Sequence, residues 1–144
     1  MQIRLYQPGD AVAEHIMSIY HEYDLCFDKD FEDDLFAIPQ MYRHGQLWVA
    51  LDAGQIVGSG AAVPDGGARL IRRMYVASSA RRKGLAQELL NRCLGFGDFA
   101  RTHLWSDVRF REAHQLYMKN GFIPGHVRVL TDPDRSVERY FWRA

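Results

Sequence analysis

The sequence predicts an α/β domain of the α+β type, with a mixed, mostly antiparallel central sheet of six to seven strands flanked by about four helices. An antiparallel meander of apolar segments occupies the first half, and two strand-to-helix units follow in the second. The length of 144 residues, 47% of them hydrophobic, allows one packed core without disulfides. We therefore expect residues 1–144 to form a single domain.

The first third of the chain predicts a strand followed by two helices. Residues 3–5 alternate between apolar and polar, which is typical of a short strand. Asp10 is placed to cap a helix whose apolar residues recur at helical spacing until about Leu25. A second helical pattern has Asp30 as its expected cap and stops near Pro39.

The rest of the chain alternates between predicted strands and helices. The remaining strands are expected at residues 47–51, 55–63, 70–76, 102–107, 122 onward and 137–142. The helices are expected at residues 85–94 and 111–120, and Gly121 is placed to close the second in a left-handed conformation.

Charge is distributed unevenly, although the formal net charge is zero. Residues 1–67 carry a net charge of −8 and residues 68–144 a net charge of +8. This asymmetry suits a protein that holds an anionic ligand with one half and a cationic ligand with the other, and it could equally attract the two halves to each other. The acidic first half argues against nucleic-acid binding, for which residues 72–73 and 81–83 would be the basic patch.

The two cysteines and the hydropathy suggest the compartment. Cys26 and Cys93 lie in apolar-rich patterns that predict two reduced, helical core thiols, with no disulfide and no metal site. No apolar run approaches the roughly 20 residues that cross a bilayer, and the N-terminus lacks a signal pattern. We expect a cytoplasmic protein with no membrane partner.

The segment Arg81–Ala86 is the strongest functional signal. It lies between a predicted strand and a predicted helix, where free backbone N–H groups at a helix N-terminus bind anions. Gly84 allows close approach of a ligand, and the three basic residues before it supply charge for a pyrophosphate. The spacing excludes the dinucleotide-binding and P-loop motifs. A solvated basic loop is the simpler alternative.

This segment resembles the [Gln/Arg]-x-x-Gly-x-[Gly/Ala] signature of the GNAT superfamily of N-acetyltransferases. Met74-Tyr75-Val76 precedes it at the family's spacing, and residues 113–122 resemble the family's second motif at the expected distance downstream. The resemblance extends to the order of elements over essentially the whole chain. It implies an acyl-CoA-dependent N-acyltransferase that uses acetyl-CoA as cosubstrate and needs no metal.

The resemblance also implies roles for individual residues. The strand at Met74–Val76 would pair with the pantetheine arm, and Tyr117 would protonate the leaving thiolate as general acid. The phenol pKa of about 10 suits a thiol near 8.5. The plainer interpretation of Tyr117 is a core tyrosine. The implied cofactor-binding residues are Met74, Tyr75, Val76, Arg81, Arg82, Lys83, Gly84, Leu85 and Ala86.

The general base is not evident in the sequence. Many relatives carry a Glu just before the basic pair of the fourth strand, where this chain has Leu70-Ile71. Asp107, His103 or a string of waters could take that role, although both side chains also suit a turn or a strand edge. Phe110 replaces the family's usual Asn. The missing carboxylate leaves open a non-catalytic acyl-CoA sensor.

The acceptor is expected to be the primary amine of a small molecule such as an amino acid, a polyamine-like compound or a xenobiotic amine. Seven carboxylates between Glu22 and Asp34 would attract a cation, although they also suit a solvated helix connection. Alternatively, Arg109 or Arg128 could bind an acceptor carboxylate. A protein N-acetyltransferase is the third possibility, and residues 140–142 could pair across a homodimer. The candidate acceptor residues are Tyr23, Phe27, Asp28, Phe31, Trp105 and Asp107.

Overall fold

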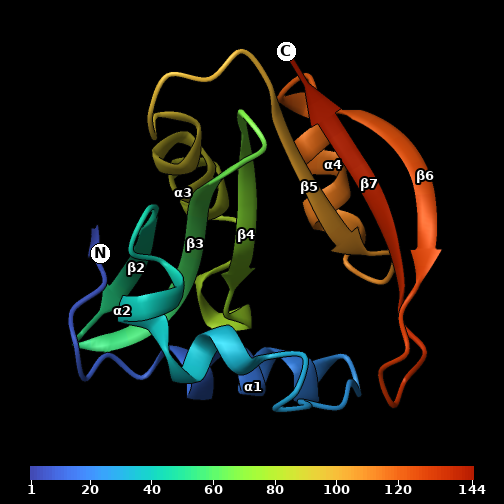
Figure 1. Cartoon of the computed structure of the whole chain (residues 1–144). Helices are drawn as coiled ribbons and strands as arrows, with labels where there is room; N and C mark the ends of the chain where they lie inside the picture. Colours follow the sequence, from blue (N-terminus) through green and yellow to red (C-terminus); the bar gives the residue numbers. More distant parts are fainter.

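The computed structural model describes residues 1–144 and contains one seven-stranded sheet with the strand order β1-β2-β3-β4-β5-β7-β6 (Figure 1). All neighbouring strands are antiparallel except β4 and β5, which are parallel. The strands are β1 (Gln2–Leu5), β2 (Gln46–Asp52), β3 (Gln55–Asp65), β4 (Ala68–Val76), β5 (Thr102–Asp107), β6 (Ile123–Val129) and β7 (Val137–Arg143). The helices are α1 (Val12–Glu22), α2 (Ile38–Met41), α3 (Leu85–Leu94) and α4 (Arg111–Lys119), with short 3-10 turns η1 (Asp33–Phe36) and η2 (Ser78–Ala80). The predicted fold class is confirmed.

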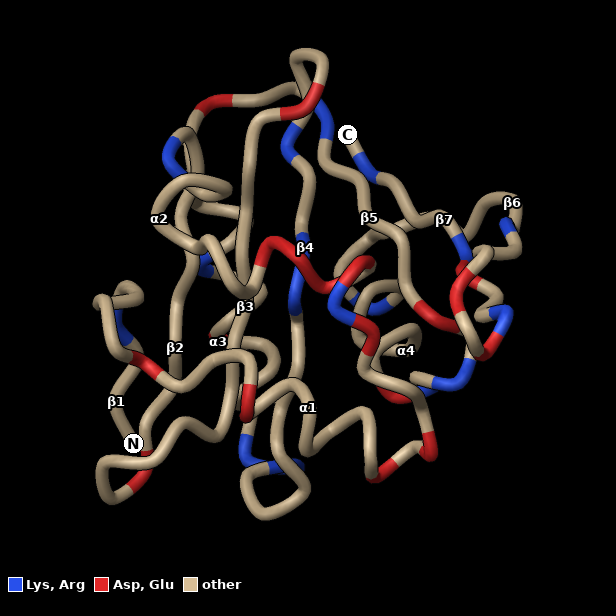
Figure 2. Tube along the Cα trace, turned by 60° about the horizontal axis from the view of Figure 1, so that its bottom comes forward, with Lys and Arg blue, Asp and Glu red and all other residues tan.

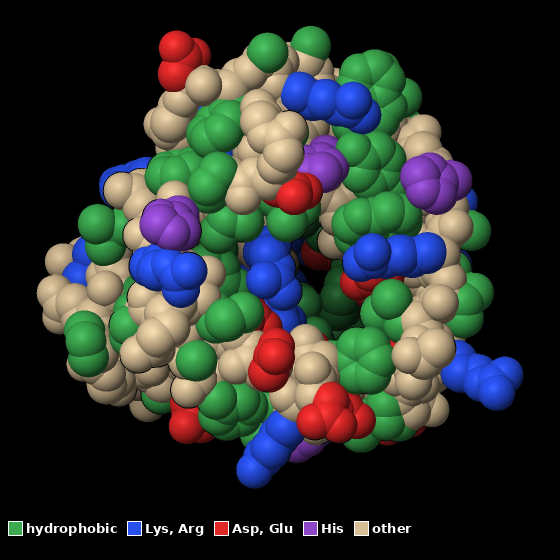
Figure 3. Space-filling view, in the orientation of Figure 1, with side chains coloured by type: hydrophobic (Ala, Val, Ile, Leu, Met, Phe, Trp, Pro, Cys, Tyr) green, Lys and Arg blue, Asp and Glu red, His purple; other side chains and the backbone are tan.

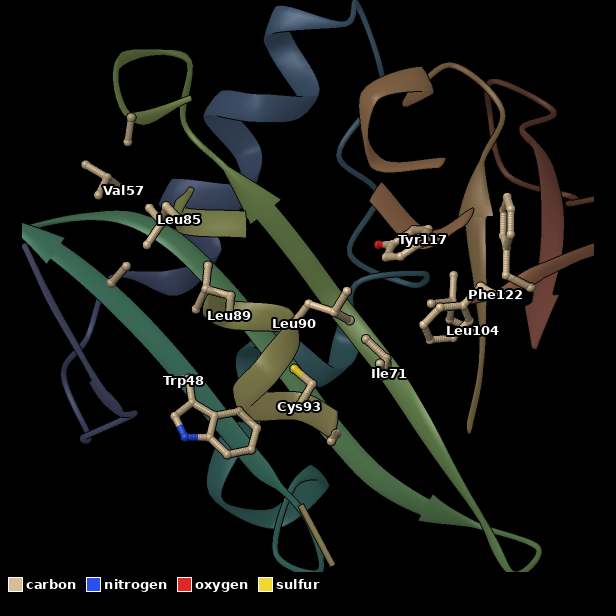
Figure 4. Packing of buried hydrophobic residues seen from close by; sticks show 14 residues of the cluster. Trp48, Val57, Ile71, Leu85, Leu89, Leu90, Cys93, Leu104, Tyr117 and Phe122 are labelled. Atoms are coloured by element: carbon tan, nitrogen blue, oxygen red, sulfur yellow. The ribbon is translucent and has the colours of Figure 1, made fainter. Parts of the chain in front are cut away.

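Helices cover both faces of the sheet. On one face, α3 contributes Leu89 and Leu90 to a cluster of 14 buried residues that also includes Leu104 of β5 and Tyr117 of α4 (Figure 4). On the other face, α1, η1 and α2 form a second cluster of 8 buried residues, which includes the fully buried Ile16. The central strands are therefore buried on both sides, and this explains the continuous apolar run in β2.

A glycine of β3 makes room for an irregular stretch of β4. The register between the two strands shifts opposite residues 59–61, and Arg73 of β4 has a φ of 58°. A Cβ atom at Gly60 would lie 2.8 Å from the Sδ atom of Met74. A larger residue at position 60 would therefore force the Met74 side chain to move.

The predicted caps and bounds of the first two helices are wrong in detail. Asp10 does not cap α1, because its carboxylate forms an ion pair with Arg4 at 2.8 Å and accepts a hydrogen bond from the N–H of Gln7. The predicted second helix is a loop followed by η1 and α2, and Asp30 caps neither. Pro39 lies in the first turn of α2 instead of ending a helix, because that position requires no N–H donor.

The two cysteines differ in environment. Cys93 is fully buried in α3, as predicted, and burial raises its thiol pKa to about 12. The prediction for Cys26 is wrong: it is exposed in the loop after α1, beyond the point where the helix ends. None of the helices combines the length and the apolar character that a membrane span requires.

Candidate active site

The sheet divides between β4 and β5. Arg69 pairs with Thr102 and Leu70 pairs with His103, and no further residues of β4 pair with residues of β5 (Figure 1). The guanidinium of Arg69 donates a hydrogen bond of 2.8 Å to Thr102 Oγ1, which ties the paired end together. The edge of β4 at Ile71–Val76 is therefore open toward β5, and an extended ligand could pair with it.

Two cavities meet at this division. The first, here called the α3 cavity, has a volume of about 690 Å³ and lies between the end of β4, the start of α3, and α4. The second, here called the β5 cavity, has a volume of about 490 Å³ and lies between β4, β5 and the loop after α1. Figure 3 shows a hollow with basic side chains in its depth and acidic side chains near its rim. Four residues line both cavities: Met74, Tyr75, Phe110 and Tyr117.

The loop before α3 presents a row of free backbone donors. Arg82 has a φ of 60° and Gly84 a φ of 79°, so the chain turns twice through the left-handed region before the helix begins. Such a turn aims successive N–H groups at one point. The N–H groups of residues 82–87 donate no hydrogen bond within the protein. This row, at the positive end of the α3 dipole, suits a phosphate-bearing ligand.

The basic side chains of this loop are not equivalent. Arg81 forms an ion pair with Glu22 of α1, with its Nη2 3.0 Å from Glu22 Oε1, and its Nε donates to the carbonyl of Val76 at 3.0 Å. Lys83 lies outside the α3 cavity, and its Nζ donates to the carbonyl of Ser79. All the other predicted cofactor residues line the cavity. Arg82 supplies the one basic side chain of the loop that lines this cavity without an ion pair.

Tyr117 lies where the two cavities join. Its ring is buried, with 3% exposure, between Phe122 and Phe141, and burial raises its hydroxyl pKa above the ordinary value. The hydroxyl makes no hydrogen bond to the protein, and Figure 4 shows it pointing from α4 toward β4. Tyr117 is thus a core residue by its ring and a cavity residue by its hydroxyl, and its role as general acid stays a prediction.

The predicted acceptor residues fall into three groups. Asp28, Phe31, Trp105 and Asp107 line the β5 cavity. Tyr23 lines the α3 cavity instead, where it packs against Phe110 with a centroid distance of 4.8 Å. The prediction for Phe27 is not supported by its position, because its ring packs between Tyr20 and Phe36 and lines neither cavity.

An ion network crosses the floor of the β5 cavity. Arg73 of β4 is 2.6 Å from Asp34 and 3.4 Å from Glu32, and the three side chains are 7%, 1% and 8% exposed. Tyr20 of α1 donates a hydrogen bond of 2.8 Å to Glu32, and its hydroxyl is 3.2 Å from that of Tyr75. Figure 2 shows the acidic segment before α2 lying beside the basic residues of β4. One basic residue of the second half of the sequence therefore meets two acidic residues of the first half here.

The two carboxylates of this network have opposite pKa shifts. Burial opposes the charge of Asp34, but the close contact with Arg73 outweighs it and holds the pKa below its usual value. Burial likewise raises the pKa of Glu32, and its bonds to Tyr20 and the longer contact with Arg73 do not reverse that shift. Glu32 is therefore the carboxylate of the pair that takes up a proton more readily.

The two side chains considered as a general base have structural partners. His103 Nδ1 is 2.7 Å from the Tyr140 hydroxyl, and its Nε2 lies 2.9 Å from Asp65 but without the geometry of a hydrogen bond. Asp107 accepts a hydrogen bond of 2.9 Å from the N–H of Arg109, which is the turn role that its position also suggested. Both residues line the β5 cavity.

Sequence reasoning missed the network of Tyr20, Glu32 and Arg73. Glu32 belongs to the acidic run, but nothing in the sequence distinguishes the two buried carboxylates from their exposed neighbours. The pairing of Arg73 with residues some 40 positions earlier depends on how the loop after α1 folds over β4. No group of three or more His, Cys, Asp or Glu side chains is arranged to hold a metal ion.

Comparisons with known proteins agree with this geometry. A family model described as "Acetyltransferase (GNAT) domain" matches residues 43–124, which include the open edge of β4, the loop before α3, and Tyr117. No curated protein sequence matches the chain significantly.

Solved structures similar to this chain share its fold. An acetyltransferase from Streptococcus agalactiae has a TM-score of 0.82 and 24% identity, covering 99% of this chain and 96% of its own. A GNAT-family acetyltransferase from Staphylococcus aureus has a TM-score of 0.78 and 22% identity, covering 99% and 98%. A spermidine N-acetyltransferase variant from Vibrio cholerae has a TM-score of 0.68 and 16% identity, covering 99% and 94%.

Proposed function

We propose that this chain, which belongs to the GNAT acetyltransferase family, transfers an acetyl group from acetyl-CoA to the primary amine of a small molecule. Acetyl-CoA would supply an activated thioester, and the chain would bind it, orient it and manage the protons. The observation that carries this proposal is the row of free N–H groups at residues 82–87, beside an open strand edge that leads to Tyr117. The residues fit the cosubstrate, because one end of the α3 cavity suits phosphates and the other offers a strand edge.

The two cavities divide the reaction between them. The backbone row would hold the diphosphate, and Met74–Val76 would pair with the extended pantetheine arm. The amine would enter through the β5 cavity and meet the thioester at the residues that line both cavities. The hydroxyl of Tyr117, which has no partner in the protein, would donate its proton to the departing thiolate.

The charges around the β5 cavity favour an acceptor that is cationic outside its reacting amine. Arg128 is 2.7 Å from Glu138 and 4.0 Å from the ring centroid of Trp105, and Arg72, which also lines this cavity, is 3.8 Å from Asp34, so both basic side chains have carboxylate partners. Asp28, Asp132 and Asp134 line the same cavity without an Arg or Lys partner within 4 Å. A polyamine-like acceptor fits this arrangement better than one bound through a carboxylate.

Calorimetry with coenzyme A tests the binding half of the proposal. Gly84→Ala would place a Cβ in the path of the ligand and strain a left-handed position, and we expect at least about tenfold weaker binding. Gly54→Ala is the matched control, because Gly54 in the β2–β3 turn has a φ of 81° and the same empty surroundings. Equal affinities for coenzyme A in the two variants would count against the proposed socket.

Thiol release from acetyl-CoA with a panel of primary amines tests the catalytic half. We expect turnover with at least one amine, and Tyr117→Phe should lower kcat by about 10²-fold or more while the dissociation constant for coenzyme A stays unchanged. Tight binding of coenzyme A without turnover for any amine would instead support an acyl-CoA sensor. If coenzyme A does not bind at all, both the transferase and the acyl-CoA sensor are ruled out.

A further inference from the structure

We propose that Glu32, carried by the loop between α1 and η1, is the general base that removes a proton from the acceptor ammonium. This inference rests on the proposed function and assigns to this chain the carboxylate that β4 lacks. A primary amine with a pKa near 10 is almost entirely protonated at neutral pH, and its lone pair is then not available for attack. A proton acceptor at the end of the acceptor path is therefore a chemical requirement of the reaction.

The position of Glu32 meets this requirement. It lines the β5 cavity together with Tyr75 and Tyr117, which also line the α3 cavity, so the base and the proposed acid face the same space. Glu32 is only 6% exposed. Its Oε1 atom accepts the hydrogen bonds from Tyr20 and Arg73, whereas no side chain donates to Oε2. One oxygen is thus held by two side chains, and the other has no side-chain donor.

Arg73 does not prevent Glu32 from acting as a base, because Arg73 interacts more closely with Asp34 than with Glu32. Asp34 is 2.6 Å from Arg73, and Glu32 is 3.4 Å away. Asp34 does not line the β5 cavity, so its carboxylate has no path to an acceptor. The ion pair therefore leaves Glu32 both buried and able to bind a proton, which is the state that a general base requires.

The surroundings of Glu32 include charged or titratable groups from every element that packs against it. Tyr20 projects from α1, Arg73 and Tyr75 from β4, and Asp28 and Asp34 flank it in the chain. The proton balance is simple. Glu32 carboxylate takes one proton from the ammonium, the neutral amine forms the amide bond as the carbon–sulfur bond breaks, and Tyr117 protonates the thiolate. The acylated nitrogen loses its second proton, which passes through water to the Tyr117 phenolate, and Glu32 returns its own proton to water.

The first test is the pH dependence of kcat/KM with acetyl-CoA and the best amine from the panel of primary amines. Glu32→Gln should lower kcat/KM at pH 7 by about 10²-fold or more and remove the acid limb that Glu32 imposes. The rate of the variant should then rise tenfold per pH unit as free amine accumulates. A profile for Glu32→Gln that is parallel to that of the wild type would overturn the proposal.

Asp34→Asn is the matched control. It removes the closer partner of the same Arg73, so any effect that passes through Arg73 alone should be at least as large in this variant. We expect it to retain the acid limb of the profile. Equal losses and equal profiles for the two variants would show that Glu32 is structural and would overturn the proposal.

Tyr20→Phe provides a second test, because it should shift the pH profile only if Glu32 is a base and not if Glu32 is merely structural. The hydrogen bond from Tyr20 favours the charged form of Glu32, so its loss should raise the pKa of that carboxyl. The acid limb of the kcat/KM profile should then shift to higher pH. An unchanged limb in a folded variant would contradict the assignment.

A measurement without turnover separates this inference from the proposed function. In protein labelled with [13C]glutamate, the side-chain carboxyl resonance of Glu32 is identified as the one lost in Glu32→Gln. We expect it to titrate above the ordinary range for glutamate, and an ordinary titration would overturn the role of Glu32 even if acetylation is observed. If no amine is acetylated, the proposed function fails, and this titration still decides whether Glu32 is poised to bind a proton.

Discussion

The two cavities are built from different materials. The α3 cavity owes its anion site to one continuous stretch of backbone, residues 82–87, whose N–H groups are free because the helix begins there. The β5 cavity owes its floor to side chains from α1, η1 and β4, which meet through buried ion pairs and hydrogen bonds. A backbone site tolerates changes in side chains, whereas a site made of buried charges depends on each partner.

The comparison predicts its largest effect at Arg73. Arg73→Met should lower the free energy of unfolding by about 3–5 kcal/mol, because Asp34 would remain charged and buried without its partner. Urea unfolding of the variant measures this loss. The double variant Arg73→Met/Asp34→Asn should be destabilised by less than the sum of the two single changes, because it leaves no buried charge from this pair. A loss below about 1 kcal/mol for Arg73→Met would mean that the floor of the β5 cavity is not held by charge.

The buried His15 of α1 is expected to make the stability of the protein depend on pH. It is 6% exposed, and burial lowers its pKa to about 4. Between pH 6.5 and 4 the unfolded chain binds a proton at this residue that the folded chain does not, so stability falls as the pH falls through that window. The loss saturates below pH 4 at about 3 kcal/mol.

The experiment on His15 compares variants because other groups also titrate. The raised pKa of Glu32 acts in the opposite direction, since the folded state binds that proton more readily. The free energy of unfolding of His15→Gln should therefore fall less steeply from pH 7 to pH 4 than that of the wild type. His126→Gln, at an exposed residue of β6, should follow the wild type. Identical slopes for wild type and His15→Gln would rule out this role.

The same difference in construction explains which features the sequence could predict. The strand bounds, α3 and the anion loop follow from local patterns, namely apolar alternation, helical spacing and a glycine at a strand-to-helix junction. The acceptor side depends on contacts between distant residues, such as Arg73 with Asp34, which local patterns do not encode. Asp10 and Phe27 have more local partners that the periodic pattern did not indicate, because their side chains contact Arg4 and Tyr20, six and seven positions earlier.

Gly60 of β3 lies beside Met74 of β4, a residue that lines both cavities. Gly60→Ala should cost about 1–3 kcal/mol, because the added Cβ would lie 2.8 Å from Met74 Sδ and 3.2 Å from Cys93 Sγ. Thermal unfolding measures the cost. Gly95→Ala is the contrasting control, because Gly95 has a φ of −80° and an added Cβ would lie 3.4 Å from its nearest neighbour, the Asn91 carbonyl oxygen. This change should therefore be neutral or slightly stabilising. Equal melting temperatures for the two variants would mean that the bulge in β4 can shift without cost.

The smallest expected effect concerns the ion pair between Glu22 and Arg81 on the cofactor side. Because this pair is partly exposed, Glu22→Gln should change the free energy of unfolding by less than about 1 kcal/mol. The freed Arg81 would then be available to a phosphate, so calorimetry should find coenzyme A bound equally well or slightly more tightly. Arg82→Gln removes a cavity-lining charge and should weaken binding, most visibly at low salt. If Glu22→Gln destabilised the protein as much as Arg73→Met, the cofactor side would depend on its side-chain charges as strongly as the acceptor side, and the distinction between a backbone site and a side-chain site would fail.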